Sequence, residues 1–143
     1  MFLGEYQHSL DAKGRITIPA RLREDLGDSF IATKGLDDCL FLYPMEEWKV
    51  MEDKLRTLPF TRRDVRAFVR FFFSGACECD LDRQGRTVLP AGLREYARID
   101  KEVMIVGVGS RVEVWACDRW ENYLQDAADS YVEIAEKLDE LGF

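Results

Sequence analysis

Apolar and polar residues alternate over short stretches separated by turn-forming residues, which is the pattern of β-strands. In the first half of the chain this pattern predicts strands at 2–10, 14–18, 30–34 and 39–43. In the second half it predicts strands near 76–81, 85–89, 102–107 and 111–116. Pro19 ends the second strand and opens a short helix over 20–26, because proline loses no hydrogen bond at a first helical position.

Helical spacing replaces the alternation in three places. A stripe of Trp48, Met51, Leu55 and Leu58 predicts a helix that stops before Pro59. A second helix begins near Thr61 with Asp64 as a capping arrangement, and its apolar face carries Val65, Phe68, Val69 and Phe72. A third begins at Asp118 and carries a heptad seam, which its own domains or a neighbouring subunit could cover: Trp120, Leu124, Ala127, Tyr131, Ile134, Leu138 and Leu141.

Two fourteen-residue segments, 11–24 and 82–95, are copies of one motif. Eight of the fourteen positions are identical at a constant offset of 71 residues, and they are Asp11/Asp82, Gly14/Gly85, Arg15/Arg86, Pro19/Pro90, Ala20/Ala91, Leu22/Leu93, Arg23/Arg94 and Glu24/Glu95. Weaker matches continue on both sides, so the chain is two copies of one unit. We divide it into a first repeat at 5–48, a helical connector at 49–75, a second repeat at 76–120 and a C-terminal helix at 121–143.

Negative charge is concentrated at the C-terminal end. The formal net charge is −7, but residues 118–143 hold eight acidic and two basic side chains, a net of −6. The other 117 residues carry 19 acidic and 18 basic side chains. The overall acidity therefore does not exclude a nucleic-acid partner, because binding depends on where the positive charge is displayed.

The cysteines and the N-terminal residues indicate a reducing compartment. Four cysteines would make a sparse disulfide framework, so we interpret them as reduced core thiols. The pair Cys77 and Cys79 raises a metal hypothesis, but alternate residues on a strand share one face, and core packing explains them better. No stretch resembles a signal peptide or a membrane span, so we expect a cytoplasmic protein without a metal or other cofactor.

Enzyme chemistry lacks a recognisable motif. The single histidine, His8, lies on a predicted strand among ordinary polar residues, where a catalytic pair has no visible partner. The Gly107-x-Gly109 sequence lacks the third glycine and the following helix of a dinucleotide site, and a hairpin turn explains it. We therefore predict no catalytic residues and no small-molecule substrate.

The duplicated D-x-x-G-R sequence is the strongest chemical signal. Asp11 and Asp82 can hydrogen-bond the turn amides, and Gly14 and Gly85 tolerate the positive φ that such a turn requires. Pairing with the motif arginines does not account for the other cations nearby. We predict that the turns bind DNA, with arginine forking onto guanine and lysine contacting phosphate, through Lys13, Arg15, Arg21, Arg23, Arg83, Arg86 and Arg94. For the arginine stripe Arg62, Arg66 and Arg70, a solvated helix face and a phosphate-contacting face both stay open.

Over its whole length the chain resembles the MraZ family. The resemblance rests on Met1-Phe-x-Gly-Glu-Tyr6, Leu10-Asp-x-Lys-Gly-Arg15, Ile18-Pro-Ala20, Leu81-Asp-x-Gln-Gly-Arg86, Leu89-Pro90, Leu93-Arg-x-Tyr96, Val114-Trp115 and Trp120. It implies an α+β, mainly β fold in which tandem AbrB-like, swapped-hairpin units form a double-split β-barrel with added helices. It also implies closure of the subunits into a ring-shaped homo-oligomer.

The same resemblance implies a nucleoid-associated regulator that binds double-stranded DNA. It would recognise short G-rich direct repeats upstream of its own division and cell-wall operon, and would usually repress that operon. The family's D-x-x-x-R motif falls on Asp11 with Arg15 and on Asp82 with Arg86. Gln84 stands where the first copy has Lys13, so we expect the first turn to bind more strongly, and we expect the acidic C-terminal helix to face away from DNA. A protein-interaction module of the antitoxin type and a carboxylate-dependent hydrolase stay as alternatives.

Overall fold

The structure of the protein is a computed structural model that describes all 143 residues. Its elements follow the chain in this order: β1 (Glu5–Ser9), β2 (Arg15–Thr17), α1 (Ala20–Leu26), β3 (Ser29–Lys34), β4 (Leu40–Pro44), α2 (Met45–Arg56), α3 (Arg63–Ser74), β5 (Cys77–Asp80), β6 (Arg86–Val88), α4 (Ala91–Tyr96), β7 (Glu102–Val108), β8 (Arg111–Ala116), α5 (Cys117–Leu138) and a final 3-10 turn, η1 (Asp139–Leu141). The eight predicted strands are confirmed, and the four predicted helices correspond to α1, α2, α3 and α5.

Three predicted boundaries were wrong in detail. β1 begins at Glu5 rather than residue 2, because Gly4 has a φ of +87° and Phe2 makes only an isolated bridge to Gly109. Neither proposed capping arrangement forms: Asp64 and Asp118 lie inside the first turns of α3 and α5, whose N-caps are not bonded by any side chain. The acidic side chains still suit those positions, because the positive end of the helix dipole lies there.

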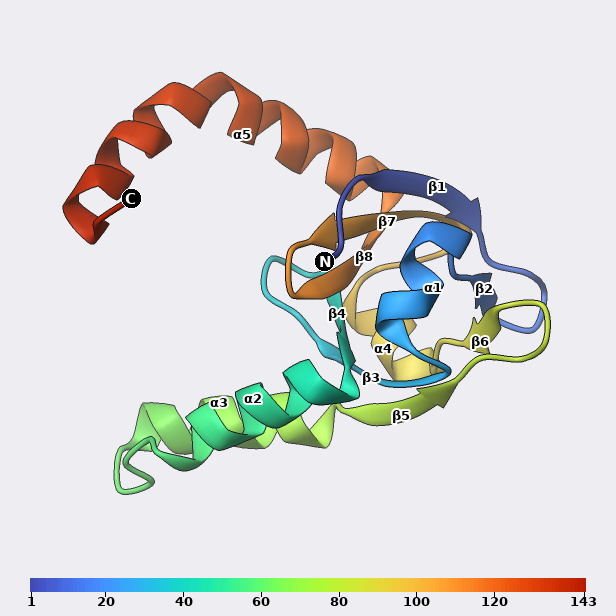
Figure 1. Ribbon diagram of the computed structural model, residues 1–143, viewed down its shortest axis with the longest axis horizontal. Helices are drawn as coiled ribbons and strands as arrows, with labels where there is room; N and C mark the ends of the chain where they lie inside the picture. The colour runs from blue at the N-terminus through green and yellow to red at the C-terminus, as the bar shows by residue number, and fades with distance from the viewer.

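The two repeats exchange their first strands. The main sheet has six strands in the order β1-β7-β8-β4-β3-β5, and all of its pairs are antiparallel. β1 of the first repeat therefore pairs with β7 of the second, while β5 of the second pairs with β3 of the first. Figure 1 shows the consequence, with strands from both ends of the colour scale interleaved in one sheet.

The fold class is α+β, built mainly on antiparallel sheet with five α-helices. Neither sheet closes on itself, since β1 and β5 form the two edges of the six-stranded sheet. The chain leaves these edge strands through the two motif turns, and β2 and β6 then pair with each other as a separate antiparallel ribbon. The double-split barrel that the family resemblance implies is therefore not confirmed: the strands form an open six-stranded sheet and a two-stranded ribbon.

One hydrophobic core joins the repeats. It contains twenty buried residues from both halves of the chain, with Leu22 and Leu26 of α1 and Leu93 and Ala97 around α4 packed against the strands. The ribbon is anchored to this core by Ile16, which has no exposed surface. Full burial of such a side chain contributes about 1.5–3 kcal/mol. Because Ile16 points inward, its neighbours Arg15 and Thr17 lie on the opposite, outer face of the ribbon.

A second, aromatic cluster anchors the longer helices. Tyr43, Phe72, Trp115 and Trp120 are buried in it, and Trp48 of α2 packs against them. The far ends of these helices extend beyond the sheet, as Figure 1 shows for the α2–α3 hairpin and for α5. None of the helices combines the length and apolar content that a membrane crossing requires.

Candidate nucleic-acid interface

The first motif turn is built around one carboxylate. The backbone N–H groups of Lys13 and Arg15 both donate to Asp11 Oδ1 at 2.9 Å, and Arg15 Nε donates to Asp11 Oδ2 at 2.6 Å. Gly14 has a φ of +76°, in the left-handed region that glycine adopts without a steric penalty. One aspartate therefore closes the turn and orients the arginine that follows it.

The second turn repeats this geometry. Gln84 N and Arg86 N donate to Asp82 Oδ1 at 2.9 Å each, and Arg86 Nε donates to Asp82 Oδ2 at 2.8 Å. Gly85 has a φ of +75°. In both turns the aspartate binds only the Nε side of the guanidinium, and the terminal nitrogens make no hydrogen bond within the chain. These nitrogens are available to an external acceptor.

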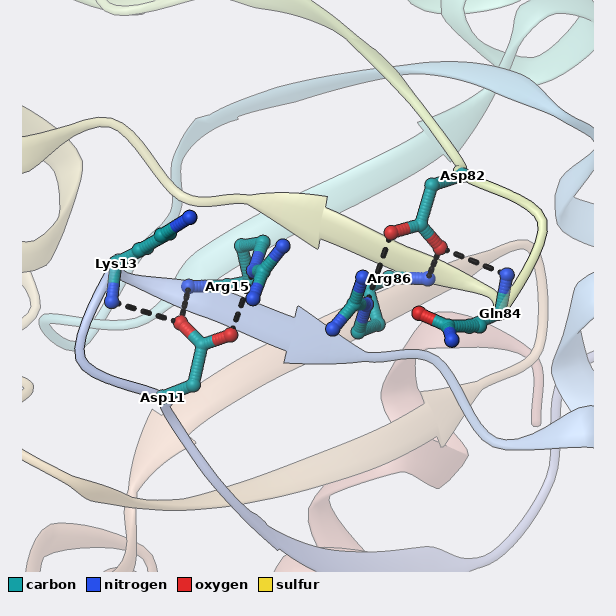
Figure 2. Close-up of polar contacts among 6 residues, drawn as sticks. All are labelled: Asp11, Lys13, Arg15, Asp82, Gln84 and Arg86. Carbon is teal, nitrogen blue, oxygen red and sulfur yellow. Dashed lines mark hydrogen bonds and ion pairs between the residues drawn. The ribbon is translucent and has the colours of Figure 1, made fainter.

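The β2–β6 ribbon brings the two arginines together. Arg15 lies opposite Val88 and Arg86 lies opposite Thr17 in the register, so both occupy outward positions of a three-residue ladder. Backbone bonds from Ile18 N to Gly85 O at 2.9 Å and from Leu89 N to Gly14 O at 3.0 Å extend the pairing toward the turns. Figure 2 shows the two Asp–Arg pairs side by side on the ribbon. Residues 71 positions apart in sequence thus form one surface.

Backbone hydrogen bonds stabilise the charged form of both aspartates. The N–H of Arg15 is the largest cause that lowers the pKa of Asp11, and the N–H of Arg86 has the same effect on the pKa of Asp82; the guanidinium groups add to it. Both carboxylates are therefore ionised at neutral pH and balance part of the arginine charge. Lys13, Arg21 and Arg83 add further positive charge in the two motif segments, and their side chains are exposed.

Arg23 and Arg94 make contacts that the sequence did not indicate. Arg23 Nε donates to the carbonyl of Ile18 at 2.7 Å, and its guanidinium covers Gly85 of the other repeat. Arg94 Nε donates to the carbonyl of Leu89 at 2.9 Å, and its guanidinium lies against Gly14, where an added Cβ would be 3.0 Å from Arg94 Cζ. Each arginine joins its own helix to the opposite turn. Their identical places in the two repeats were the only signal of a shared role.

The arginine stripe of α3 has local partners. Arg62 pairs with Asp64 at 2.7 Å, and Arg66 donates to the backbone carbonyls of Phe60 and Thr61 at 3.1 and 2.9 Å. Figure 1 shows this helix hairpin and the β2–β6 ribbon on opposite sides of the molecule. The stripe is therefore not part of the surface that carries the motif arginines.

The remaining candidates for chemistry are scattered. His8 is half-buried on β1, opposite Val103 of β7. The four cysteines are free thiols. No group of three or more His, Cys, Asp or Glu side chains lies close enough together to hold a metal ion.

Comparisons with known proteins agree with the duplication. The chain matches, at residues 1–71 and again at 72–141, the family described as "MraZ protein, putative antitoxin-like". It is 68% identical over 142 residues to the transcriptional regulator MraZ of Syntrophomonas wolfei, covering 99% of both chains. The protein of that name from Moorella thermoacetica is 64% identical over 138 residues, with 96% of each chain covered. The one from Pelotomaculum thermopropionicum is 64% identical over 141 residues, covering 99% of this chain and 97% of the relative.

Proposed function

Because the chain belongs to the MraZ family of transcriptional regulators, we propose that it binds double-stranded DNA sequence-specifically through the β2–β6 ribbon. The main support for this proposal is the orientation of Arg15 and Arg86. Each guanidinium donates to its aspartate through Nε, and its terminal nitrogens are free on one face of the ribbon. Arginine recognises guanine by donating two parallel hydrogen bonds to O6 and N7. The major groove of DNA admits a two-stranded β-ribbon.

The surrounding cations divide into two groups in this proposal. Lys13, Arg21 and Arg83 are exposed and contact phosphates, which contributes affinity without sequence information. Arg23 and Arg94 hold the turns in position and add charge to the same surface. Since Gln84 replaces the lysine of the first turn, the first repeat binds DNA more strongly than the second.

A single ribbon makes few contacts, so useful affinity requires several copies on repeated sites. We propose a ring-shaped homo-oligomer that binds short G-rich direct repeats upstream of its own division and cell-wall operon and represses it. The protein then acts in the cytoplasm, associated with the nucleoid. For the fold, we propose that the open sheet and the ribbon of each subunit together make up a double-split barrel of two AbrB-like units.

The heptad seam of α5 is the surface that we assign to subunit contacts. Beyond the buried Trp120 most of the seam is exposed, with Tyr131 72% and Leu141 83% exposed, while Ala127 and Leu138 are half-buried. The acidic face of α5 suits the arginine-bearing helix α3 of a second copy, where Arg63 and Arg70 make no ion pair. Figure 1 shows α5 extending away from the β2–β6 ribbon, which keeps its negative charge away from DNA.

The decisive experiment is fluorescence anisotropy with a duplex of G-rich direct repeats and a scrambled duplex, at several salt concentrations. The double variant Arg15→Lys/Arg86→Lys keeps both charges but loses the planar fork. With about 1–3 kcal/mol of discrimination for each bidentate pair, it should lose most of the preference for the repeats and keep its weaker, salt-dependent binding.

Two controls test whether a loss of preference is due to the motif arginines themselves. Arg56→Lys on α2, whose side chain is 75% exposed, is the matched control and should leave affinity and preference unchanged. Circular dichroism must show all variants folded. Equal, weak binding of wild type to both duplexes would refute the proposal and direct attention to a protein partner, since the exposed α5 seam also suits an antitoxin-type interaction.

A further inference from the structure

Two cysteine thiols face each other at the edge of the sheet that leads into the second motif turn. Cys77 and Cys79 are alternate residues of β5, and their Sγ atoms are 3.8 Å apart. Cys79 is 5% exposed and belongs to the main core, whereas Cys77 is half-buried. Cys77 also lines a surface depression of about 370 Å³, together with Lys34, Gly75, Pro90 and Gly92. One thiol is thus open to a small reagent, and the other lies directly behind it.

Their arrangement does not suit a metal ion. Structural zinc sites have four ligands, and no third His, Cys, Asp or Glu side chain joins these two sulfurs. Two adjacent thiols, of which one is partly accessible, are instead the arrangement of a reactive cysteine and its resolving partner.

We propose that Cys77 and Cys79 form a thiol-oxidation site, at which a hydroperoxide converts the pair to a disulfide and thereby weakens DNA binding by the second turn. The effect on DNA binding rests on the proposed function, while the thiol chemistry is independent of it. The acidity of the Cys77 thiol supports this chemistry, because a hydrogen bond from the Cys79 thiol lowers the pKa of Cys77 to about 7. The same bond and burial raise the pKa of Cys79.

The reaction balances in two steps. The Cys77 thiolate attacks the terminal O–H oxygen of the peroxide and the O–O bond breaks, giving a sulfenic acid on Cys77; hydroxide leaves from hydrogen peroxide, and alkoxide leaves from an organic hydroperoxide. Cys79 then attacks Cys77 Sγ, the S–O bond breaks, and water leaves with the thiol proton. The two cysteines are oxidised by two electrons, and the hydroperoxide is reduced to water and, for an organic peroxide, the alcohol.

Formation of a disulfide bond between Cys77 and Cys79 requires a local change in the conformation of β5. Residues two apart on a strand have Cα atoms about 6.6 Å apart, near the upper end of the disulfide range. The sulfurs must also close from 3.8 Å to a bond of about 2 Å. β5 is an edge strand that pairs only with β3, so its free side can buckle.

The second motif turn lies next to the site. Asp80 ends β5 and Asp82 begins the turn two residues later. The buried hydroxyl of Thr87, on β6 between Arg86 and Val88, lies beside Cys79. Buckling of β5 therefore shifts both Asp82 and the strand that carries Arg86.

Cys117 provides the internal comparison. It is also half-buried, but burial and the neighbouring Glu102, Glu121 and Asp118 raise the pKa of its thiol. In the reduced full-length protein at pH 7.5, a short pulse of iodoacetamide should label Cys77 at least about tenfold faster than Cys117. Peptide mass mapping measures the two rates. Equal rates would overturn the inference.

Oxidation supplies the second test. Hydrogen peroxide should lower the mass of wild type and of Cys117→Ser by about 2 Da, with the bridge mapped to Cys77 and Cys79. Cys77→Ser, checked for folding by circular dichroism, should form no such bridge. A disulfide between subunits, or one that includes Cys39 or Cys117, would refute the site.

DNA binding gives the third readout. The Kd of the oxidised wild type for the repeat duplex should rise by about fivefold or more, because avidity across turns is reduced, and dithiothreitol should restore it. The Kd of Cys77→Ser should not respond to peroxide. If the bridge forms and the Kd is unchanged, the regulatory part is refuted. If the reduced protein does not bind the duplex at all, the proposed function fails while the thiol results stand.

Discussion

The crossed arginines predict that two equivalent glycines differ in their tolerance of alanine. Gly14 and Gly85 have the same backbone conformation, with φ of +76° and +75°. A Cβ at Gly14 would lie 3.0 Å from Arg94 Cζ, so the arginine needs to move by a few tenths of an ångström. A Cβ at Gly85 would overlap the guanidinium of Arg23, which donates to the Ile18 carbonyl at 2.7 Å.

These contacts determine how much the two alanine variants should differ in their free energy of unfolding. Both alanines cost about 1–2 kcal/mol for the left-handed backbone conformation. Gly85→Ala also displaces Arg23 from its bond to Ile18, a charge-assisted interaction of about 1.5 kcal/mol or more. We expect Gly85→Ala to lower the free energy of unfolding by about 2.5–4 kcal/mol, and Gly14→Ala by about 1–2 kcal/mol.

Urea unfolding followed by tryptophan fluorescence measures both values. A double-mutant cycle with Arg23→Ala isolates the contact, because Gly85→Ala should cost only the backbone term once Arg23 is truncated. Gly92→Ala is the matched control: it has open space around the added methyl group and lies within α4, so it should be neutral or stabilising. Equal losses for the two motif glycines, or additive energies in the cycle, would refute the assigned contact.

Three further predictions concern charge and assembly. Gln84→Lys should make the second turn resemble the first, increasing DNA affinity and steepening the salt dependence by about 0.9 for each added phosphate contact; Lys13→Gln should do the reverse in the same titration, and unchanged slopes would contradict the assignment. Because the pKa of Asp82 lies below its ordinary value of 3.8, wild type gains stability above that pH and loses it as the pH falls through the lowered pKa. Urea unfolding should therefore show Asp82→Asn less stable at pH 7, with the difference shrinking below about pH 4; a constant difference would exclude the linkage. Ile134→Glu on α5 should reduce the mass in analytical ultracentrifugation without changing the fold, whereas an unchanged mass would show that the seam does not hold subunits together.

Much of the candidate site was accessible from local sequence. The aspartate, glycine and arginine of each motif lie within five residues, and their hydrogen bonds join only neighbours along the chain. Hydrogen bonds between such near neighbours in a turn depend on residue type and spacing, and they require no distant partner. For the same reason, the strands and most helix ends were predictable from alternation, proline and apolar stripes.

The helix starts show where local signals failed. Thr61 and Asp64 have the spacing of a capping box, yet Asp64 pairs with Arg62 and α3 begins at Arg63. An exposed arginine beside the carboxylate competes for the oxygens that a cap would use. The sequence pattern could not rank these two partners, because both were within reach.

The sequence by itself determined the duplication, the composition of each turn, the strands and the acidic, amphipathic C-terminal helix. Only the tertiary structure decided that β1 and β5 change places between the repeats, that β2 pairs with β6, and that Arg23 covers Gly85. The physical reason is that the two repeats have nearly the same apolar pattern. Each strand could bury its inner face against the equivalent partner in either copy, so the choice depends on how one shared core fills best, which no local stretch of sequence encodes.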